Sequence, residues 1–318
     1  MQDYRQLFQR QSTTWPLAEK NYQALSEVVF KDLTIDHIRI RLQFNPGRMT
    51  SSAADTSKDA IRARPCFLCA ENRPSEQESL TFKTKNASIS EFQILVNPFP
   101  VFPQHFTIAS TEHQLQAIHG NFKSFLQLGK SMEDCVIFYN GPRCGASAPD
   151  HLHFQAGSKG IIPLESDYGQ WKKTLIRKGQ DMSVSKMEGL LRNGLVMEGS
   201  DSNELSDAFE QLLDLLKSEN PASTEEPMLN LLCWYQNGSW ICLIFPRKAH
   251  RPKCYFKNDD TKLLISPAAV EMGGVMVAAR REDFDKIEEK EIREIYGDVS
   301  VSEKEIDLIS KKFKERKP

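Results

Sequence analysis

Two histidines and a glutamine alternate with apolar residues in one short stretch, His151-Leu152-His153-Phe154-Gln155. In an extended strand successive side chains point to opposite faces, so a strand here aligns His151, His153 and Gln155 on one face. An imidazole can attack phosphorus through one ring nitrogen while the other nitrogen donates the hydrogen bond that fixes its tautomer. A lone histidine on a strand is usually a solvated polar side chain, but three aligned polar groups predict a catalytic strand with His153 as nucleophile.

The residues around this strand are suited to binding phosphate. The carboxamide of Gln155 can hydrogen-bond a phosphoryl oxygen without acting as an acid or base, which favours holding an intermediate for transfer. In the preceding loop, backbone amides near Gly145 and the hydroxyl of Ser147 can bind phosphate oxygens. Arg143 or Lys159 can offset the charge that develops on those oxygens, although each cation taken singly is more typical of a solvated surface.

A Cys-x-x-Cys pair, Cys66 and Cys69, indicates a metal site. The chain has seven cysteines, an odd number, and no export signal, so a close pair is more typical of metal binding than of a disulfide. Zinc needs two further ligands, usually Cys or His, and no second such pair exists. Among the seven histidines, His113 and His151 are the best placed on this reading. The alternative is a pair of reduced loop cysteines without a metal.

The elements that position these residues can be predicted from hydrophobic patterns. Strands are expected at 38–44, 92–96, 105–109 and 135–139, and the last of these leads into the loop before His151. Apolar residues from Leu115 to Leu126 recur at helical spacing, which predicts a helix that begins directly after His113. The Ser/Ala/Asp-rich run 50–59 is predicted to be a loop.

The second half predicts a sheet of its own. Asn237-Gly238 lies between apolar runs at 229–234 and 240–245, which is a strong β-hairpin signal. A helix is expected near 204–216, a strand of small residues at 273–279, and a charged helix at the C-terminus. A pattern of strand, helix and strand thus occurs twice, which indicates an α+β duplication.

Composition excludes several classes of function. The chain has 318 residues, 40% of them hydrophobic, and a formal net charge of -2. This balance gives no electrostatic reason to expect nucleic acid or an anionic membrane as a partner. No apolar run approaches the length that spans a bilayer. We expect a cytoplasmic protein that binds neither nucleic acid nor membrane.

The central motif carries a family resemblance. His151 to Gln155, preceded by Asn140-Gly141 and Gly145-Ala146-Ser147, resembles the His-x-His-x-Gln signature of the nucleotidyltransferase branch of the histidine-triad (HIT-like) superfamily. That branch includes galactose-1-phosphate uridylyltransferase, diadenosine tetraphosphate phosphorylase and GDP-L-galactose phosphorylase. The last is the closest likeness, through His151 to Ala156, Pro163-Leu164-Glu165, and the later segment 266–277.

The resemblance implies a fold and a set of roles. It implies duplicated HIT-like units of mainly antiparallel sheets flanked by helices, with a catalytic half over 1–200 and a second half over 201–318. His153 becomes the covalent nucleotidyl acceptor and Gln155 its phosphate partner. The expected zinc ligands are Cys66, Cys69, His113 and His151, and the expected substrate contacts are Asn140, Arg143, Gly145, Ser147 and Lys159.

The expected activity is nucleotidyl transfer or phosphorolysis of a nucleoside diphosphate-sugar or a dinucleoside polyphosphate, with phosphate or a sugar phosphate as acceptor. Gln155 in place of a third histidine argues against a simple histidine-triad hydrolase. Two alternatives remain open: a hydrolase of the same superfamily, which needs no added phosphate, and a non-catalytic nucleotide-binding protein. The chain is expected to be either a pseudo-dimeric monomer or a homodimer.

Overall fold

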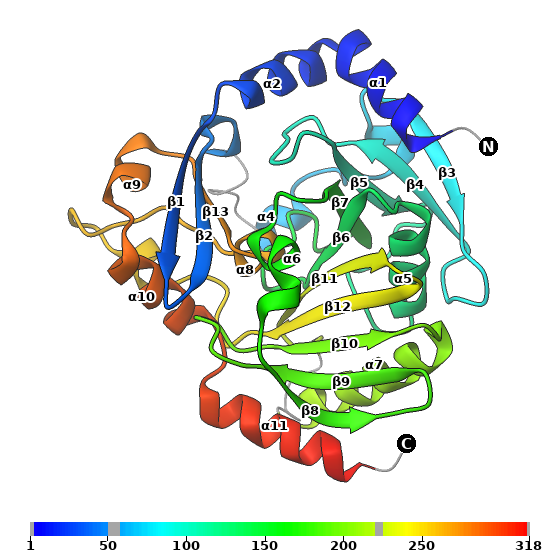
Figure 1. Ribbon diagram of the computed structural model, residues 1–318. Coiled ribbons are helices and arrows are strands. Elements are labelled where there is room, and N and C mark those ends of the chain that lie inside the picture. Colours follow the sequence, from blue (N-terminus) through cyan, green and yellow to red (C-terminus); the bar gives the residue numbers. More distant parts are fainter. Residues whose placement is uncertain (1–2, 50–57, 220–224, 317–318) are drawn as a thin grey trace.

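The computed structural model describes residues 3–49, 58–219 and 225–316, which form two sheets with helices around them (Figure 1). Most of the loop predicted at 50–59 lies outside these residues. The strands are β1 Val29–Ile35, β2 Ile38–Phe44, β3 Ser79–Lys83, β4 Glu91–Val96, β5 His105–Ser110, β6 Cys135–Asn140, β7 His153–Ser158, β8 Lys173–Lys178, β9 Met182–Met187, β10 Leu195–Gly199, β11 Leu229–Gln236, β12 Ser239–Pro246 and β13 Val275–Ala278. The helices are α1 Tyr4–Thr14, α2 Pro16–Ser26, α4 Lys58–Arg62, α5 Phe122–Ser131, α6 Pro163–Ser166, α7 Ser202–Ser218, α8 Ala269–Met272, α9 Arg281–Lys286, α10 Glu289–Val299 and α11 Glu303–Glu315.

The larger sheet contains the same arrangement of strands twice. Its order is β3-β4-β5-β7-β6-β11-β12-β10-β9-β8. Three strands, a helix and two strands, β3-β4-β5-α5-β6-β7, form the first unit, and β8-β9-β10-α7-β11-β12 repeat that sequence of elements and that order in the sheet. The predicted α+β duplication of mainly antiparallel units is therefore confirmed.

The two units meet through their fourth strands. β6 pairs antiparallel with β11, with Asn140 opposite Asn230, so one sheet runs through both units. The prediction that the second half has a sheet of its own was wrong. The hairpin signal at Asn237-Gly238 pairs β11 with β12, but it does not show which strand pairs with the other edge of β11. The repeated topology changes over between Ser158 and Lys173, and we propose this junction as the domain boundary in place of residue 200.

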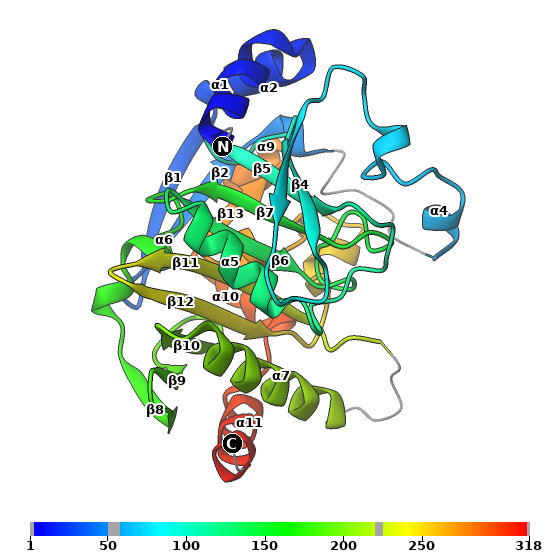
Figure 2. The same ribbon diagram turned by 90° about the vertical axis from the view of Figure 1, so that its right-hand side faces the viewer.

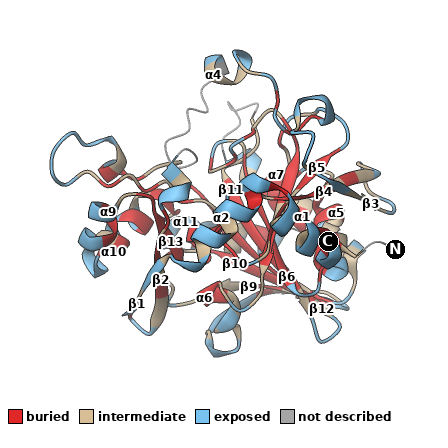
Figure 3. Ribbon diagram, turned by 90° about the horizontal axis from the view of Figure 1, so that it is seen from above, coloured by how far each residue is buried: buried red, intermediate tan, exposed pale blue. Residues whose placement is uncertain are grey.

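Each face of the large sheet has its own apolar core. Helices α5 and α7 cross one face (Figure 2), where Phe125 and Phe209 are buried with Phe154 of β7. The other face lies under the small sheet, whose order is β1-β2-β13 with β2 and β13 parallel. There Leu42 and Val277 of the small sheet are buried in one core with Leu243 of β12. Figure 3 shows the buried residues concentrated in the strands between these layers.

The hairpin of the second unit follows its sequence signal closely. Asn237 and Gly238 both adopt positive φ, of 50° and 81°, as a two-residue turn between right-twisted strands requires. Within residues 3–49, 58–219 and 225–316, no helix combines the length and the apolar character needed to cross a bilayer.

Candidate active site and metal centre

The residues expected to act on phosphorus lie on β7, between β5 and β6. His153 and Gln155 share one face of this strand, while Phe154 and Ala156 are buried in the core on the opposite face. The strand begins at His153, so His151 precedes it in a bend. The expectation that His151 continues the polar face of the strand was therefore wrong. The backbone turns here because Leu152 bonds both to Gln114 and to Ser110.

The hydrogen bonds of His153 define its tautomer. Its Nδ1 lies 2.8 Å from the carbonyl oxygen of His151, and a carbonyl can only accept, so Nδ1 carries the proton. Burial lowers the pKa of His153 to about 4, which keeps the ring neutral at pH 7. Nε2 is then left with a free lone pair, as a nucleophile requires.

A second histidine, which the sequence reasoning missed, fixes the carboxamide of Gln155. His105 at the start of β5 accepts from the backbone N–H of Val101 at Nδ1, 3.2 Å away. Its proton must therefore sit on Nε2, which donates to Oε1 of Gln155 at 3.0 Å. Burial, reinforced by the Arg48 guanidinium, lowers the pKa of His105 to about 3. The neutral ring turns the NH₂ group of Gln155 away from itself.

Gln116 holds the backbone between β6 and β7, and no sequence pattern pointed to it. Its Oε1 accepts from the N–H of His153 at 2.8 Å. Its Nε2 donates to the carbonyl oxygens of Asn140 and His153, at 2.9 and 3.1 Å. The side chain is only 2% exposed. One buried amide thus joins the end of β6 to the start of β7.

The loop 141–150 has the backbone of an anion site. Among the described residues, the backbone amides of Gly145, Ala146 and Ser147 donate to no acceptor. Gly145 has φ +106°, and a Cβ added there would lie 2.4 Å from the Cβ of Ala268. A glycine is therefore required twice over, by the backbone conformation and by the close approach of α8.

Four predicted ligands come together beside this loop. Cys66, Cys69, His113 and His151 place one ligand atom each within 4.8 Å of one another, and all but His113 are buried. Sγ of Cys66 lies 3.3 Å from Nδ1 of His151, and Sγ of Cys69 lies 3.2 Å from Nδ1 of His113. These four residues could hold a metal ion.

The groups around these ligands hold them in an orientation suited to metal binding. Nε2 of His151 lies 2.9 Å from the carbonyl oxygen of Ser110, so its proton is on Nε2 and Nδ1 is free to coordinate. The cysteine turn is closed by the bond from the N–H of Cys69 to the carbonyl of Cys66. The side chain of Asn72 donates to the same carbonyl of Cys66, and that of Arg73 donates to the carbonyl of Leu68.

His113 reaches the cluster from irregular backbone. The expectation that a helix begins directly after it was wrong, because α5 begins at Phe122. The intervening segment is held by Glu226, which accepts from the N–H of Ile118 at 2.6 Å and from the hydroxyl of Tyr139 at 2.6 Å. A tertiary contact from the second half therefore replaces the helical hydrogen bonds that the apolar spacing had suggested.

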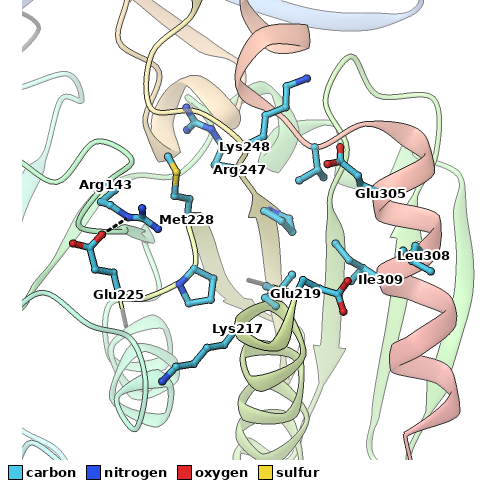
Figure 4. Close-up of a pocket in the computed structure, with 14 residues that line it drawn as sticks. Arg143, Lys217, Glu219, Glu225, Met228, Arg247, Lys248, Glu305, Leu308 and Ile309 are labelled. Carbon is cyan, nitrogen blue, oxygen red and sulfur yellow. Dashed lines mark ion pairs between the residues drawn. The ribbon is translucent and has the colours of Figure 1, made fainter. Parts of the chain in front are cut away.

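Three residues predicted to contact the substrate, Arg143, Ser147 and Lys159, bond to other parts of the protein instead. Lys159 follows the far end of β7, roughly 20 Å from His153 at the rise of a strand, and donates to the carbonyl of Tyr235. Arg143 pairs with Glu225 at 3.0 Å and lines a cavity of about 500 Å³, as Figure 4 shows. Ser147 is exposed, and its carbonyl accepts from Arg64. Nothing in this geometry supports a phosphate contact for Lys159.

Two family models match this chain, and they meet at the junction between the two repeated units. Residues 169–316 match the family described as GDPGP1-like, C-terminal domain. Residues 7–158 match a domain of unknown function, DUF4922. The comparison with curated protein sequences gave no significant match.

Two solved structures of one yeast protein share the fold at low sequence identity. Yeast Ap4A phosphorylase Apa2 has a TM-score of 0.55 and 16% identity, over 92% of this chain and 94% of its own. The structure of its complex with AMP has a TM-score of 0.53 and 15% sequence identity, over 88% of each chain. A DUF4931 family protein from Bacillus cereus has a TM-score of 0.39 and 16% sequence identity, over 57% of this chain and 94% of its own. With its GDPGP1-like second half and the fold of the Ap4A phosphorylase, the protein is related to the HIT-like nucleotidyltransferase and phosphorylase superfamily.

Proposed function

We propose that the protein is a nucleotidyltransferase or phosphorylase that forms a covalent nucleotidyl-histidine on His153. The observation that carries this proposal is the neutral His153 ring, with Nδ1 committed to a carbonyl and Nε2 free. The oriented amide of Gln155 supports it, because an NH₂ group beside the nucleophile can bind a phosphoryl oxygen. The substrate is a nucleoside diphosphate-sugar or a dinucleoside polyphosphate.

The reaction proceeds in two displacements. In the first, the lone pair of Nε2 forms a bond to the α-phosphorus, and the bond from that phosphorus to the leaving phosphate oxygen breaks with its electron pair. In the second, an oxygen of inorganic phosphate or of a sugar phosphate attacks the same phosphorus, and the N–P bond returns its electrons to Nε2. The free amides of the loop 145–147 and the NH₂ of Gln155 hold the non-bridging oxygens throughout.

Zinc is the metal that best fits the four-ligand group. Two thiolates and two imidazoles are a usual donor set for structural zinc, and bond lengths of 2.0–2.3 Å imply ligand atoms about 3.6 Å apart in a tetrahedron. The S···N separations of 3.2, 3.3 and 3.6 Å fit that geometry. Bound zinc would fix His151 and hence the carbonyl that holds His153; we assign it no step in the reaction.

The pairing of β6 with β11 supports a pseudo-dimeric monomer. Both units lie in one chain and share one sheet, so the association that two separate units would make is already internal. Gel filtration with light scattering tests this point, and a mass of twice 36.3 kDa would contradict it.

Trapping the intermediate tests the mechanism. Protein incubated with α-³²P-labelled nucleoside diphosphate-hexoses or Ap4A, then quenched in alkali, should retain about one label per chain. His153→Ala should retain none. His119→Ala is the matched control, because His119 is 73% exposed and pairs with Glu210 on α7. Equal labelling of wild type and His153→Ala would refute the proposal. Turnover of the same panel with and without phosphate separates a phosphorylase from a hydrolase.

A further inference from the structure

A chain of buried polar groups crosses the junction between the two units. It begins at Arg247, directly after β12, passes through Asn230 of β11 and ends at Asn140 of β6. These three side chains are between 0% and 6% exposed. Polar groups this deeply buried destabilise a fold unless their hydrogen bonds are made, so the direction of each bond is informative.

Arg247 fixes the orientation of Asn230. Nε, Nη1 and Nη2 of Arg247 bond the carbonyl oxygens of Val299, Pro267, Ala249 and His250. Nη1 also donates to Oδ1 of Asn230. Because a guanidinium has donors and no acceptor, Asn230 must present its oxygen to Arg247. Its NH₂ group then faces the first unit.

Asn230 in turn fixes the orientation of Asn140. Nδ2 of Asn230 donates to Oδ1 of Asn140 at 3.0 Å and to the carbonyl of Cys144 at 2.8 Å. The N–H of Ala269, in α8, donates to the same Oδ1 at 2.8 Å. Two donors therefore occupy the oxygen of Asn140. Among the described residues its Nδ2 has no partner, and it is not one of the buried unpartnered atoms, so it is open to a ligand.

This free NH₂ group lies next to the nucleophile. Phe138 of β6 is paired with Gln155 of β7, so Asn140 and His153, each two residues away, point to the same face as that pair. Gln116 bonds the carbonyls of both residues, which places the two strand ends side by side.

We infer that Arg247 and Asn230 are positioning residues of the second unit, which hold the carboxamide of Asn140 with its NH₂ group toward the nucleotide phosphate bound at His153. The inference rests on the proposed function for the identity of the ligand. It assigns the second unit a part in recognising the phosphate, although that unit contributes neither nucleophile nor metal ligand.

Asn230→Asp tests the inference with a nearly isosteric change. The carboxylate still accepts from Arg247. The stronger, charge-assisted bond to the guanidinium offsets the bond to the Cys144 carbonyl that Asp cannot donate, so thermal stability should stay near that of the wild type. The carboxylate cannot donate to Asn140 and its oxygen repels Oδ1 of Asn140, so only the N–H of Ala269 still holds that amide. The NH₂ group of Asn140 is then no longer fixed toward the phosphate. Affinity for AMP and GMP, measured by titration calorimetry, should fall by about tenfold or more, the size expected for one hydrogen bond to a charged group.

The new negative charge could weaken binding without any rotation, and a double-mutant cycle separates the two effects. In an Asn140→Ala background the amide is absent, so Asn230→Asp should change affinity by less than about threefold. Asn193→Asp is the charge control: Asn193 donates to the carbonyl of Val301 elsewhere in the second unit, and its variant should bind as the wild type does.

Each outcome decides the inference. A tenfold loss that vanishes in the Asn140→Ala background, with thermal stability retained, supports it. An equal loss in both backgrounds, or no loss, overturns it while leaving the labelling of His153 intact. If Asn230 and Asn140 are coupled in AMP and GMP binding but His153 takes up no covalent label, only the proposed reaction would be overturned. A wild-type protein that binds neither AMP nor GMP would overturn the inference, because no phosphate would then meet the amide.

Discussion

The last strands of the two units, β7 and β12, occupy the same place in the repeated topology but present different side chains to the small sheet's side of the large sheet. β7 presents His153 and Gln155, whereas β12 presents Ile241, Leu243 and Phe245, which are buried with the small sheet. The difference teaches how a polar strand face is maintained. Each polar group on β7 has a dedicated partner, and the corresponding face of β12 needs none because it packs as an apolar core.

All four residues of the candidate metal site lie in the first half of the chain, and loss of this site should have the largest effect. Cys66→Ser removes one thiolate, and we expect loss of bound metal together with on the order of 4 kcal/mol of unfolding free energy. Elemental analysis and urea unfolding measure both. Cys254→Ser removes a buried thiol of the second half, and should keep the metal at a cost of about 1 kcal/mol. Unchanged metal content in Cys66→Ser would contradict the assignment.

The loop 141–150 can be tested at Gly145, where it contacts Ala268. Gly145→Ala places a Cβ against Ala268 at positive φ, so we expect a loss of about 3 kcal/mol from strain and overpacking together. Ala268→Gly in the same chain should restore part of it, because the positive φ remains. Gly238→Ala, at φ +81° with open space around it, should cost about 1 kcal/mol. Equal costs at the two glycines would show that the contact with α8 contributes nothing.

His105 orients Gln155 through one hydrogen bond, and its effect should be confined to catalysis. In His105→Ala the carboxamide of Gln155 loses the bond that orients it, and we expect kcat to fall roughly 10- to 100-fold, as for other orienting partners. The KM for the nucleotide should change less than kcat. Steady-state kinetics on the substrate identified by the labelling panel measures both, and an unaltered kcat would remove His105 from the site.

The smallest expected effect lies on the apolar strand. Ile241→Val removes one methylene from the core under β12 and should cost about 1 kcal/mol of unfolding free energy. Labelling of His153 should be unchanged, because β12 carries no group that touches the phosphate. A large loss of labelling with normal stability would show that β12 takes part directly in the reaction, and β7 and β12 would then not differ in function.

Residues that are local in sequence were the predictable part of the site. The two-residue spacing of His153 and Gln155 and the turn at Cys66 and Cys69 follow from strand and turn geometry. His105 and Gln116 were missed because neither lies in a motif; each matters through hydrogen bonds to residues distant in the sequence. The helix predicted after His113 failed for the same reason, since Glu226 holds that backbone in an irregular course.

The sequence by itself predicted the duplication, the strand that carries His153 and the four residues that could hold a metal ion, because these depend on periodicity, on residue chemistry and on the family resemblance. Only the tertiary structure decided that the strands of both units form one ten-stranded sheet, that His151 lies outside β7, and that Lys159 contacts Tyr235 at the far end of that strand. Strand pairing and buried hydrogen bonds join residues through space. The direction in which Asn140 presents its amide depends on Arg247, more than a hundred residues away along the chain.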